Sequence, residues 1–247
     1  MINLPKLIGH RGVKNLLPEN TIDSIKLASE LGLKWVEFDV KISKDSVPIL
    51  LHDDHLDRTT NGKGLAVDHL YNDLKKLDAG SFFYNKSTKI YIPTFLEILL
   101  LLNNKNIGLN IELKPNKGFE KKNVESIAKD LKDFKFSNQY YFSSFDWNSL
   151  ILMKKLLPNA NYGLLIDEFT SDINLNEIIT IAKKYNFFCC GFNVDLINSE
   201  IIDIMLKNNL TITVYSEKNI KFNEANDLWG LGIKSIFIDD PKEFKLN

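Results

Sequence analysis

Charged side chains end several of the short apolar runs in this 247-residue chain, at positions where ordinary core residues are expected. The segment KLIGHRG turns from apolar residues to His10 and Arg11, with a glycine on either side of the pair. Histidine can transfer protons near neutral pH, and the planar guanidinium of arginine binds anions such as phosphate. This pairing indicates a site that holds an anionic group and moves a proton on it.

Three carboxylates follow in two further β-prone runs. Glu37 and Asp39 stand two residues apart in the run 36–42, so their side chains share one face of the expected strand. Glu112 and Lys114 have the same spacing in the run 108–114. Three carboxylates without a nearby cysteine form an oxygen-rich site suited to a hard divalent cation, Mg²⁺ or Ca²⁺. Arg11 and Lys114 would then hold an anion against the cation.

A second histidine comes from a predicted hairpin in FDVKISKDSVPILLHDD, residues 38–54. A two-residue turn at 45–46 places His52 opposite Asp39 on the neighbouring strand, with about 4.5–5.5 Å between their Cβ atoms. Two histidines can divide the roles of general base and general acid. Together with a metal and cations, they indicate cleavage of a phosphate ester.

Some other polar and aromatic residues have competing interpretations. Asp239, at the end of the last predicted strand, is equally consistent with a helix cap and with a site residue. Ser143 and Ser144 have no GxSxG motif or neighbouring base, which favours packing at a strand end over a nucleophile. Phe82 and Phe83 are expected in the small core of an inserted segment rather than in a pocket wall.

The elements that must position these residues alternate between β-prone runs and helical patterns. Apolar residues recur at helical spacing over 21–31 and 124–134, among other stretches. The predicted strands are Lys6–His10, Val36–Ile42, Gly108–Lys114, Gln139–Phe145, Tyr162–Ile166, Cys189–Val194, Thr211–Tyr215 and Ser235–Ile238. Eight strands, each expected to precede a helix, favour a (β/α)8 TIM barrel, with residues of about 56–91 inserted after the second-strand hairpin. An open doubly wound sheet is the alternative, but no GxGxxG follows the first run.

Composition describes one ordinary globular domain over residues 1–247. Hydrophobic residues make up 44% and charged residues 26% of the chain, and the net charge of −1 gives no basic surface for nucleic acid. The longest apolar stretch, Phe95–Leu102, is broken by Glu97 and is too short to span a bilayer, so stable membrane insertion is not expected. The N-terminus lacks the layout of a signal peptide, and the adjacent cysteines Cys189 and Cys190 are best explained as reduced thiols. A cytoplasmic protein is therefore expected, and its oligomeric state is open.

Several motifs, in their order and spacing, resemble the glycerophosphodiester phosphodiesterase family over nearly the whole chain. They are GHRG, PENT, EFDV, LLHDDHLDRTTNGKG, LDAGSFF, IPTFLEIL, IELKP, SSFD and FIDDP. The resemblance implies a (β/α)8 barrel that hydrolyses glycerophosphodiesters to glycerol 3-phosphate and an alcohol.

Carried over position by position, the resemblance also implies a role for each site residue. His10 and His52 would be the acid/base pair, and Arg11 and Lys114 would bind phosphate. The divalent cation would be bound by Glu37, Asp39 and Glu112. Glu19 in PENT would organise the mouth of the site, and Tyr215 stands in the pocket wall where relatives often have tryptophan.

Two other functions compete with this interpretation. The same chemistry could act on lysophospholipid head groups, which would require an apolar groove or a membrane-seeking loop. The insertion offers only Phe82, Phe83 and Tyr84 for that purpose. A non-catalytic module that binds phosphodiesters would be indicated by loss of a histidine or a metal carboxylate, and none of these residues is missing.

Overall fold

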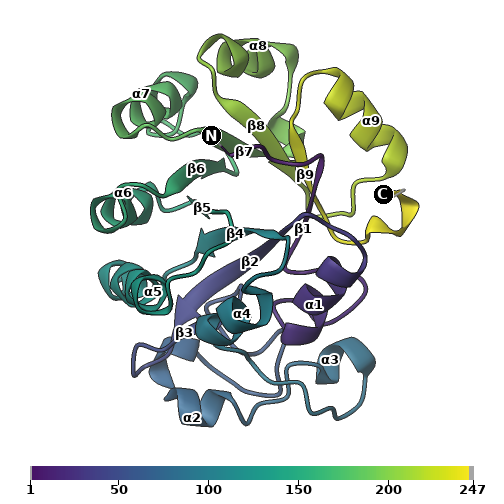
Figure 1. Cartoon of the computed structure of the whole chain (residues 1–247), viewed down its shortest axis with the longest axis vertical. Coiled ribbons are helices and arrows are strands. Elements are labelled where there is room, and N and C mark those ends of the chain that lie inside the picture. The colour runs from purple at the N-terminus through teal and green to yellow at the C-terminus, as the bar shows by residue number, and fades with distance from the viewer. Residues whose placement is uncertain (1, 245–247) are drawn as a thin grey trace.

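The computed structural model describes residues 2–244 and shows a ring of helices around a central sheet (Figure 1). The strands that run parallel are β1 (Leu7–Gly9), β2 (Trp35–Ile42), β4 (Gly108–Leu113), β5 (Tyr140–Ser144), β6 (Asn161–Ile166), β7 (Cys189–Asn193), β8 (Thr211–Tyr215) and β9 (Ser235–Ile238). The helices between them are α1 (Ile22–Glu30), α4 (Phe95–Leu102), α5 (Glu120–Phe134), α6 (Trp147–Leu156), α7 (Leu175–Tyr185), α8 (Ser199–Lys207) and α9 (Phe222–Gly230). The predicted strands are therefore confirmed, with small shifts at their ends.

The sheet is closed, because β1 pairs in parallel with both β9 and β2. From β9 the order runs back through β8, β7, β6, β5 and β4 to β2. This closure confirms the TIM barrel and excludes the open doubly wound sheet. Only β3 (Pro48–Leu50) runs antiparallel among the described strands, on the edge of β2.

Alternation along β2 decides which of its residues enter the barrel. Val36, Phe38 and Val40 belong to the hydrophobic core that includes residues of α4, between the sheet and the helices. Because successive side chains of a strand point to opposite faces, Glu37 and Asp39 point into the barrel. Both carboxyl side chains are buried there.

Side-chain caps mark where the first two of these helices begin. Thr21 accepts a hydrogen bond from the Ser24 backbone N–H at 3.2 Å and starts α1. Thr94 and Glu97 form a reciprocal capping box at the start of α4. These local bonds satisfy backbone donors that a helix leaves unpaired in its first turn. They fix the start of α1 after the loop that follows β1, and the start of α4 after the insertion.

The hairpin forms as predicted, but its predicted register is wrong by one residue. Val40 pairs with Leu50, and the backbone N–H of Leu51, not that of His52, bonds to the carbonyl of Asp39 at 3.2 Å. The turn contains three residues, because Ser43 and Val47 pair across it and Ser46 has a left-handed φ of 63°. A three-residue turn that ends in a left-handed residue is a common alternative to the two-residue turn assumed from the sequence.

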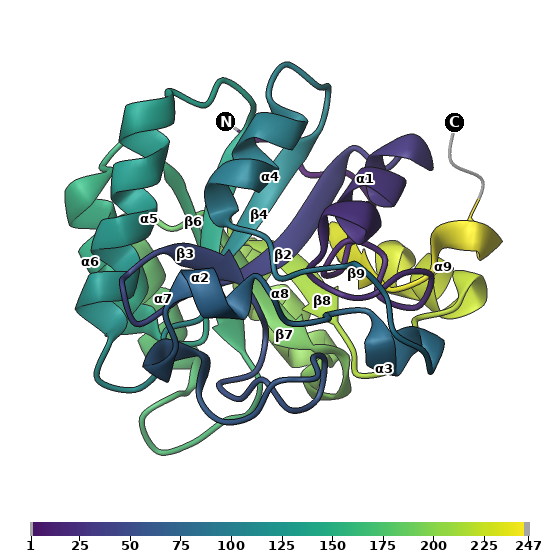
Figure 2. The same cartoon turned by 90° about the horizontal axis from the view of Figure 1, so that it is seen from below.

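The insertion after β3 is confirmed and carries its own short elements. They are a 3₁₀ turn (Ala66–Asp68), α2 (Tyr71–Leu74) and α3 (Ser81–Tyr84); the two helices lie at the bottom of Figure 1 and on the side facing the viewer in Figure 2. Its core contains Leu56, Leu74 and Ile92, which pack on Ile49 and Leu51 of the hairpin. The expectation that Phe82 and Phe83 form this core is wrong. Their exposed fractions are 55% and 42%, because the aliphatic residues already fill the small interior.

The last parallel strand departs from the expected alternation. Within the described residues, β9 is followed only by a 3₁₀ turn at Pro241–Glu243, so the expected helix is absent there. Asp240 caps this turn, accepting from the Lys242 backbone N–H at 2.9 Å, and proline at its first position supplies the fixed φ of a helical turn. In residues 2–244, no helix is both long and apolar enough to cross a bilayer.

Candidate active site

Most of the predicted site residues line one cavity of about 480 Å³ at the carboxyl ends of the strands. They are His10, Arg11, Glu37, His52, Glu112, Lys114 and Tyr215. The other two predicted residues adjoin this group: Asp39 is buried within 3.7 Å of Lys114, and Glu19 contacts Arg11. A volume of this size accommodates a small molecule. The structure thus brings together the whole predicted set.

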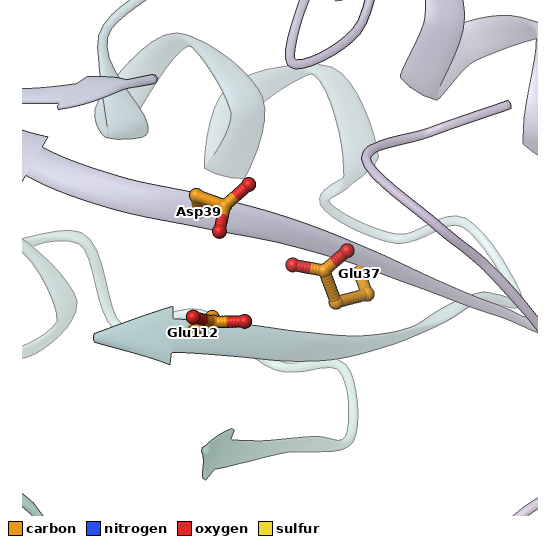
Figure 3. A group of neighbouring side chains, drawn as sticks. All are labelled: Glu37, Asp39 and Glu112. Atoms are coloured by element: carbon orange, nitrogen blue, oxygen red, sulfur yellow. The ribbon is translucent and has the colours of Figure 1, made fainter. Parts of the chain in front are cut away.

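Glu37, Asp39 and Glu112 form a compact carboxylate triad, with one oxygen from each lying within 4.8 Å of the others (Figure 3). Strand register explains the cluster, since Asp39 is directly paired with Glu112 between the parallel strands β2 and β4. All three side chains are buried. Alternation along a strand places Glu37 and Asp39 on one face of β2, but only the pairing of β2 with β4 brings Glu112 beside them.

Burial and mutual repulsion set the ionisation of the triad. Burial, followed by repulsion from Asp39 and Glu112, raises the pKa of Glu37 well above its ordinary value. Burial also raises the pKa of Glu112, although Lys114 partly opposes this. For Asp39, burial acts in the same direction, but the Lys114 and Arg11 cations prevail and hold its pKa below the usual range.

The triad fits a divalent cation. Glu37 Oε1 is buried and accepts no hydrogen bond from the part of the chain that the structure describes, whereas Oε2 accepts from the Arg11 backbone N–H at 2.8 Å. An unpaired buried carboxylate oxygen beside two other carboxylates is costly unless a positive charge neutralises it. Carboxylate oxygens are also the ligands that hard cations such as Mg²⁺ and Ca²⁺ prefer.

His10 lies in a buried corner of the site against Asp239. Its Nδ1 is 2.7 Å from Asp239 Oδ1, and the Lys14 ammonium lies 3.3 Å from the other oxygen of that carboxylate. Burial lowers the pKa of His10 to about 4, despite the opposing hydrogen bond to Asp239. The imidazole is therefore neutral at pH 7, with Nδ1–H donating to Asp239 and Nε2 left as the basic atom.

His52 reaches the cavity by a bend in the chain rather than by the predicted strand pairing. The segment after β3 leaves the ladder at Leu51, and the next residue points into the cavity. His52 Nδ1 is 2.7 Å from Asp53 Oδ1, which orients the ring through its neighbour in sequence. Each catalytic candidate histidine thus has its own carboxylate partner.

A tight turn after β1 presents Arg11 to the triad. Arg11 itself has a left-handed φ of 49°, and Gly12 follows with φ of 85°. A side chain at position 12 would collide with Ser24 in α1, since a Cβ there would lie 2.4 Å from its Oγ. Positive φ at a non-glycine residue is uncommon and concentrates at functional sites. The conformation directs the guanidinium to within 3.6 Å of Asp39, and Glu19 accepts from it at 2.9 Å.

Lys114 and Tyr215 complete the cavity wall. The Lys114 ammonium donates to Glu112 at 2.7 Å and lies 5.0 Å from the centre of the Phe145 ring. Its pKa is raised because the Glu112 and Asp39 carboxylates outweigh burial, so it stays charged. The Tyr215 hydroxyl donates to Asp167 at 2.9 Å, and the ring meets Phe145 edge to face.

Three residues of this site were missed or left open in the sequence analysis. Of the two interpretations of Asp239, the contact with His10 favours a site residue. Asn20, quoted in PENT without a role, donates to Asp39 at 2.8 Å. Asn110 lines the cavity, and its Nδ2 is buried without a hydrogen-bond partner among residues 2–244. Its position two residues before Glu112 was a usable signal, because residues at that spacing share a strand face.

The serines expected to pack at a strand end do so. Ser143 donates to Asn110 at 2.7 Å, and Ser144 donates to the backbone carbonyl of Leu113 at 2.6 Å. Both side chains are fully buried between β4 and β5. A nucleophilic role for either is therefore not supported.

Comparisons with known proteins agree with this geometry. A glycerophosphodiester phosphodiesterase from Bacillus altitudinis is 32% identical over 243 residues, which covers 96% of each chain. Another, from Caldanaerobacter subterraneus, is 39% identical over 159 residues, 64% of this chain and 65% of the relative. A phosphodiesterase from Oleispira antarctica, solved in complex with the product sn-glycerol-3-phosphate, superposes with a TM-score of 0.89. It is 30% identical, over 98% of this chain and 96% of that one. Residues 10–243 match the glycerophosphoryl diester phosphodiesterase family, and the chain belongs to that family.

Proposed function

We propose that this enzyme hydrolyses glycerophosphodiesters to glycerol 3-phosphate and an alcohol. The observation that supports this most directly is the shared cavity, which joins an acidic triad, two cations and two histidines. The Oleispira antarctica phosphodiesterase, similar over almost the whole chain, binds sn-glycerol-3-phosphate as product. A non-catalytic binding module is not favoured, because both histidines retain a carboxylate partner of the kind that a proton-transfer residue needs.

We further propose that Glu37, Asp39 and Glu112 bind one divalent cation. Bound there, the cation supplies Lewis-acid polarisation of the phosphoryl group. Arg11 and Lys114 lie beside the triad and stay charged, so they would hold the phosphoryl oxygens. Fixed positive groups around the phosphate stabilise charge that develops on its oxygens in the transition state.

The different surroundings of the two histidines support different roles in the first step. His10 is neutral and has an unprotonated Nε2, so it would accept a proton. His52 is less buried, and its Nδ1 lies 2.7 Å from the Asp53 carboxylate, which leaves Nε2 as the ring atom free to face the substrate; we assign it the complementary role of donor to the departing alcohol. The sequence alone left this assignment open.

The attacking group is proposed to be the substrate's own C2 hydroxyl. Its oxygen forms a bond to phosphorus, its proton passes to His10, and the bond from phosphorus to the alcohol breaks as His52 protonates that oxygen. An internal nucleophile held near phosphorus has a large entropic advantage over free water. In the second step a water oxygen bonds to phosphorus and its proton passes to His52, while the bond from phosphorus to the C2 oxygen breaks as His10 protonates that oxygen, which yields glycerol 3-phosphate.

A substrate analogue that lacks the C2 hydroxyl is expected to bind but hardly react. Without that oxygen, the cyclic phosphate cannot form, whereas the phosphate contacts to Arg11 and Lys114 remain. The measurement compares turnover of the 2-deoxy analogue with its potency as a competitive inhibitor of the normal substrate. Turnover at the normal rate would instead indicate direct attack by water.

The reaction itself is tested with a panel of glycerophosphodiesters that differ in their alcohol. Released glycerol 3-phosphate is assayed with a coupled dehydrogenase, and lysophospholipids with the same head groups form a second set. Release from the first set supports the proposed function. Cleavage confined to lysophospholipids would favour the lipid-cleaving alternative, and no release from either set would refute both.

A further inference from the structure

We propose that Arg58, in the insertion, is a positioning residue for this reaction. It links the segment after β3, which carries His52, to the loop between β1 and α1, which carries Arg11. The inference rests on the function proposed above and adds a residue that touches neither the cavity nor the carboxylate triad. The insertion then becomes part of the active-site framework rather than a surface appendage.

The first contact joins Arg58 to the partner of His52. Its Nε lies 2.6 Å from Asp53 Oδ2, and its Nη2 lies 3.0 Å from Asp53 Oδ1. The same Oδ1 is 2.7 Å from Nδ1 of the imidazole. Two parallel bonds from a planar guanidinium fix the plane of the carboxylate, and the carboxylate in turn fixes the plane and tautomer of the ring.

The second contact joins Arg58 to the partner of Arg11. Its Nη1 lies 2.8 Å from Glu19 Oε2, and its Nη2 lies 2.8 Å from Glu19 Oε1. That Oε1 also accepts from Arg11 Nη1 at 2.9 Å. Glu19 is 39 positions earlier in the chain, in the loop between β1 and α1. One guanidinium thus binds a carboxylate in each of the two segments, and its Nη2 contacts both Glu19 and Asp53.

This arrangement differs from an ordinary surface ion pair, which contributes little. Although the Arg58 side chain is 47% exposed, the Glu19 side chain with which it forms an ion pair is only 14% exposed. Burial raises the pKa of both Glu19 and Asp53, but the hydrogen bonds and charge of Arg58, together with those of Arg11 at Glu19 and of His52 at Asp53, prevail and lower it, so both carboxylates stay charged acceptors. A lysine could not replace this fork, because its ammonium is a point charge.

The core of the insertion holds Arg58 at the required place. Leu56 is completely buried in that core, and Thr60 is 1% exposed. The Thr60 hydroxyl and backbone N–H both donate to the Leu56 carbonyl, at 2.8 and 3.1 Å, and close a turn around Arg58. Because this buried turn fixes the backbone of Arg58, the guanidinium can hold Asp53 and Glu19 at defined positions beside His52 and Arg11.

The test compares Arg58→Gln and Arg58→Lys with a matched control, Lys63→Gln. Lys63 also forms an ion pair within the insertion, with Asp57 at 3.2 Å, but it is 81% exposed and does not reach the site. Arg58→Gln is expected to lower kcat by about 10–100-fold, the range typical of groups that orient a reacting residue, with a smaller rise in KM. Arg58→Lys should recover only part of the loss, and Lys63→Gln should match wild type.

A second measurement reports on His52 without catalysis. Nitrogen-15 NMR at alkaline pH identifies which ring nitrogen carries the proton, with the His52 signal assigned from its absence in His52→Asn. Wild type is expected to show the Nδ1–H tautomer, as the bond to Asp53 requires, and Arg58→Gln a mixture of tautomers. Wild-type-like tautomer and kcat in Arg58→Gln, or full activity in Arg58→Lys, would overturn the proposal.

The two readouts separate this proposal from the function on which it rests. If wild type releases no glycerol 3-phosphate while the tautomer still changes in Arg58→Gln, the proposed function fails and the positioning role stands. If wild type is active and Arg58→Gln behaves like Lys63→Gln in both measurements, the positioning role fails alone.

Discussion

Replacing either His10 or His52 by alanine is expected to lower kcat by about 10²–10⁴-fold, the usual contribution of general acid–base catalysis. In the proposed reaction, His10 accepts the proton of the attacking hydroxyl and His52 protonates the departing alcohol. Each substitution removes one proton transfer and leaves Arg11 and Lys114 to bind the phosphate. The loss should therefore appear mainly in kcat, measured from the release of glycerol 3-phosphate.

His10→Asn provides a sharper variant than alanine. Its side-chain amide can still donate to Asp239, which is otherwise left buried with only Lys14 nearby. The variant nevertheless lacks the basic Nε2, so a catalytic role predicts the same loss of turnover with better-preserved stability. His55→Ala is the matched control, because this histidine is exposed in the insertion.

The double variant distinguishes one proton-transfer sequence from two independent contributions. Effects of residues that act as a unit are not additive, so His10→Ala with His52→Ala should cost much less than the product of the single losses. Near-normal turnover in either single variant would remove that histidine from the mechanism.

Removal of divalent cations is expected to abolish activity, and Glu112→Gln is expected to weaken cation binding and turnover together. Glu37, Asp39 and Glu112 are buried within one small cluster, and their mutual repulsion favours a bound cation in a site of low dielectric. Glutamine preserves the shape of Glu112 but removes a negative ligand. The measurements are activity after exhaustive chelation, its recovery on titration with Mg²⁺ or Ca²⁺, and calorimetric titration of the same ions.

Glu125→Gln is a suitable comparison for this experiment, because Glu125 lies on the exposed face of α5 and its side chain is 50% exposed. It should bind cations and turn over like wild type. Both variants should remain folded, since the amide introduced by Glu112→Gln can still occupy the position of the carboxylate beside Lys114. Full activity in the chelated wild-type protein would contradict the metal requirement.

Local sequence patterns were enough to predict most of the strands and helices of this protein and the charged side chains that gather in its site. Two-residue alternation by itself placed Glu37 with Asp39, and Glu112 with Lys114, on single strand faces. Such patterns are reliable because they depend on geometry within one strand or helix. The alternation of strands and helices also indicated the barrel, since eight parallel strands with covering helices have few compact arrangements.

Only the tertiary structure decided how residues distant in sequence became partners. Asp239 bonds to His10 across 229 positions, because β1 and β9 pair where the barrel closes. The hairpin register depended on the conformation of Ser46, and a single left-handed residue shifted the pairing by one. Arg58 could not be assigned from its surroundings in sequence, since its contact with Glu19, 39 positions earlier, forms only when the insertion packs against the loop after β1. Long-range contacts of this kind depend on the packing of the whole chain, which no short window of sequence contains.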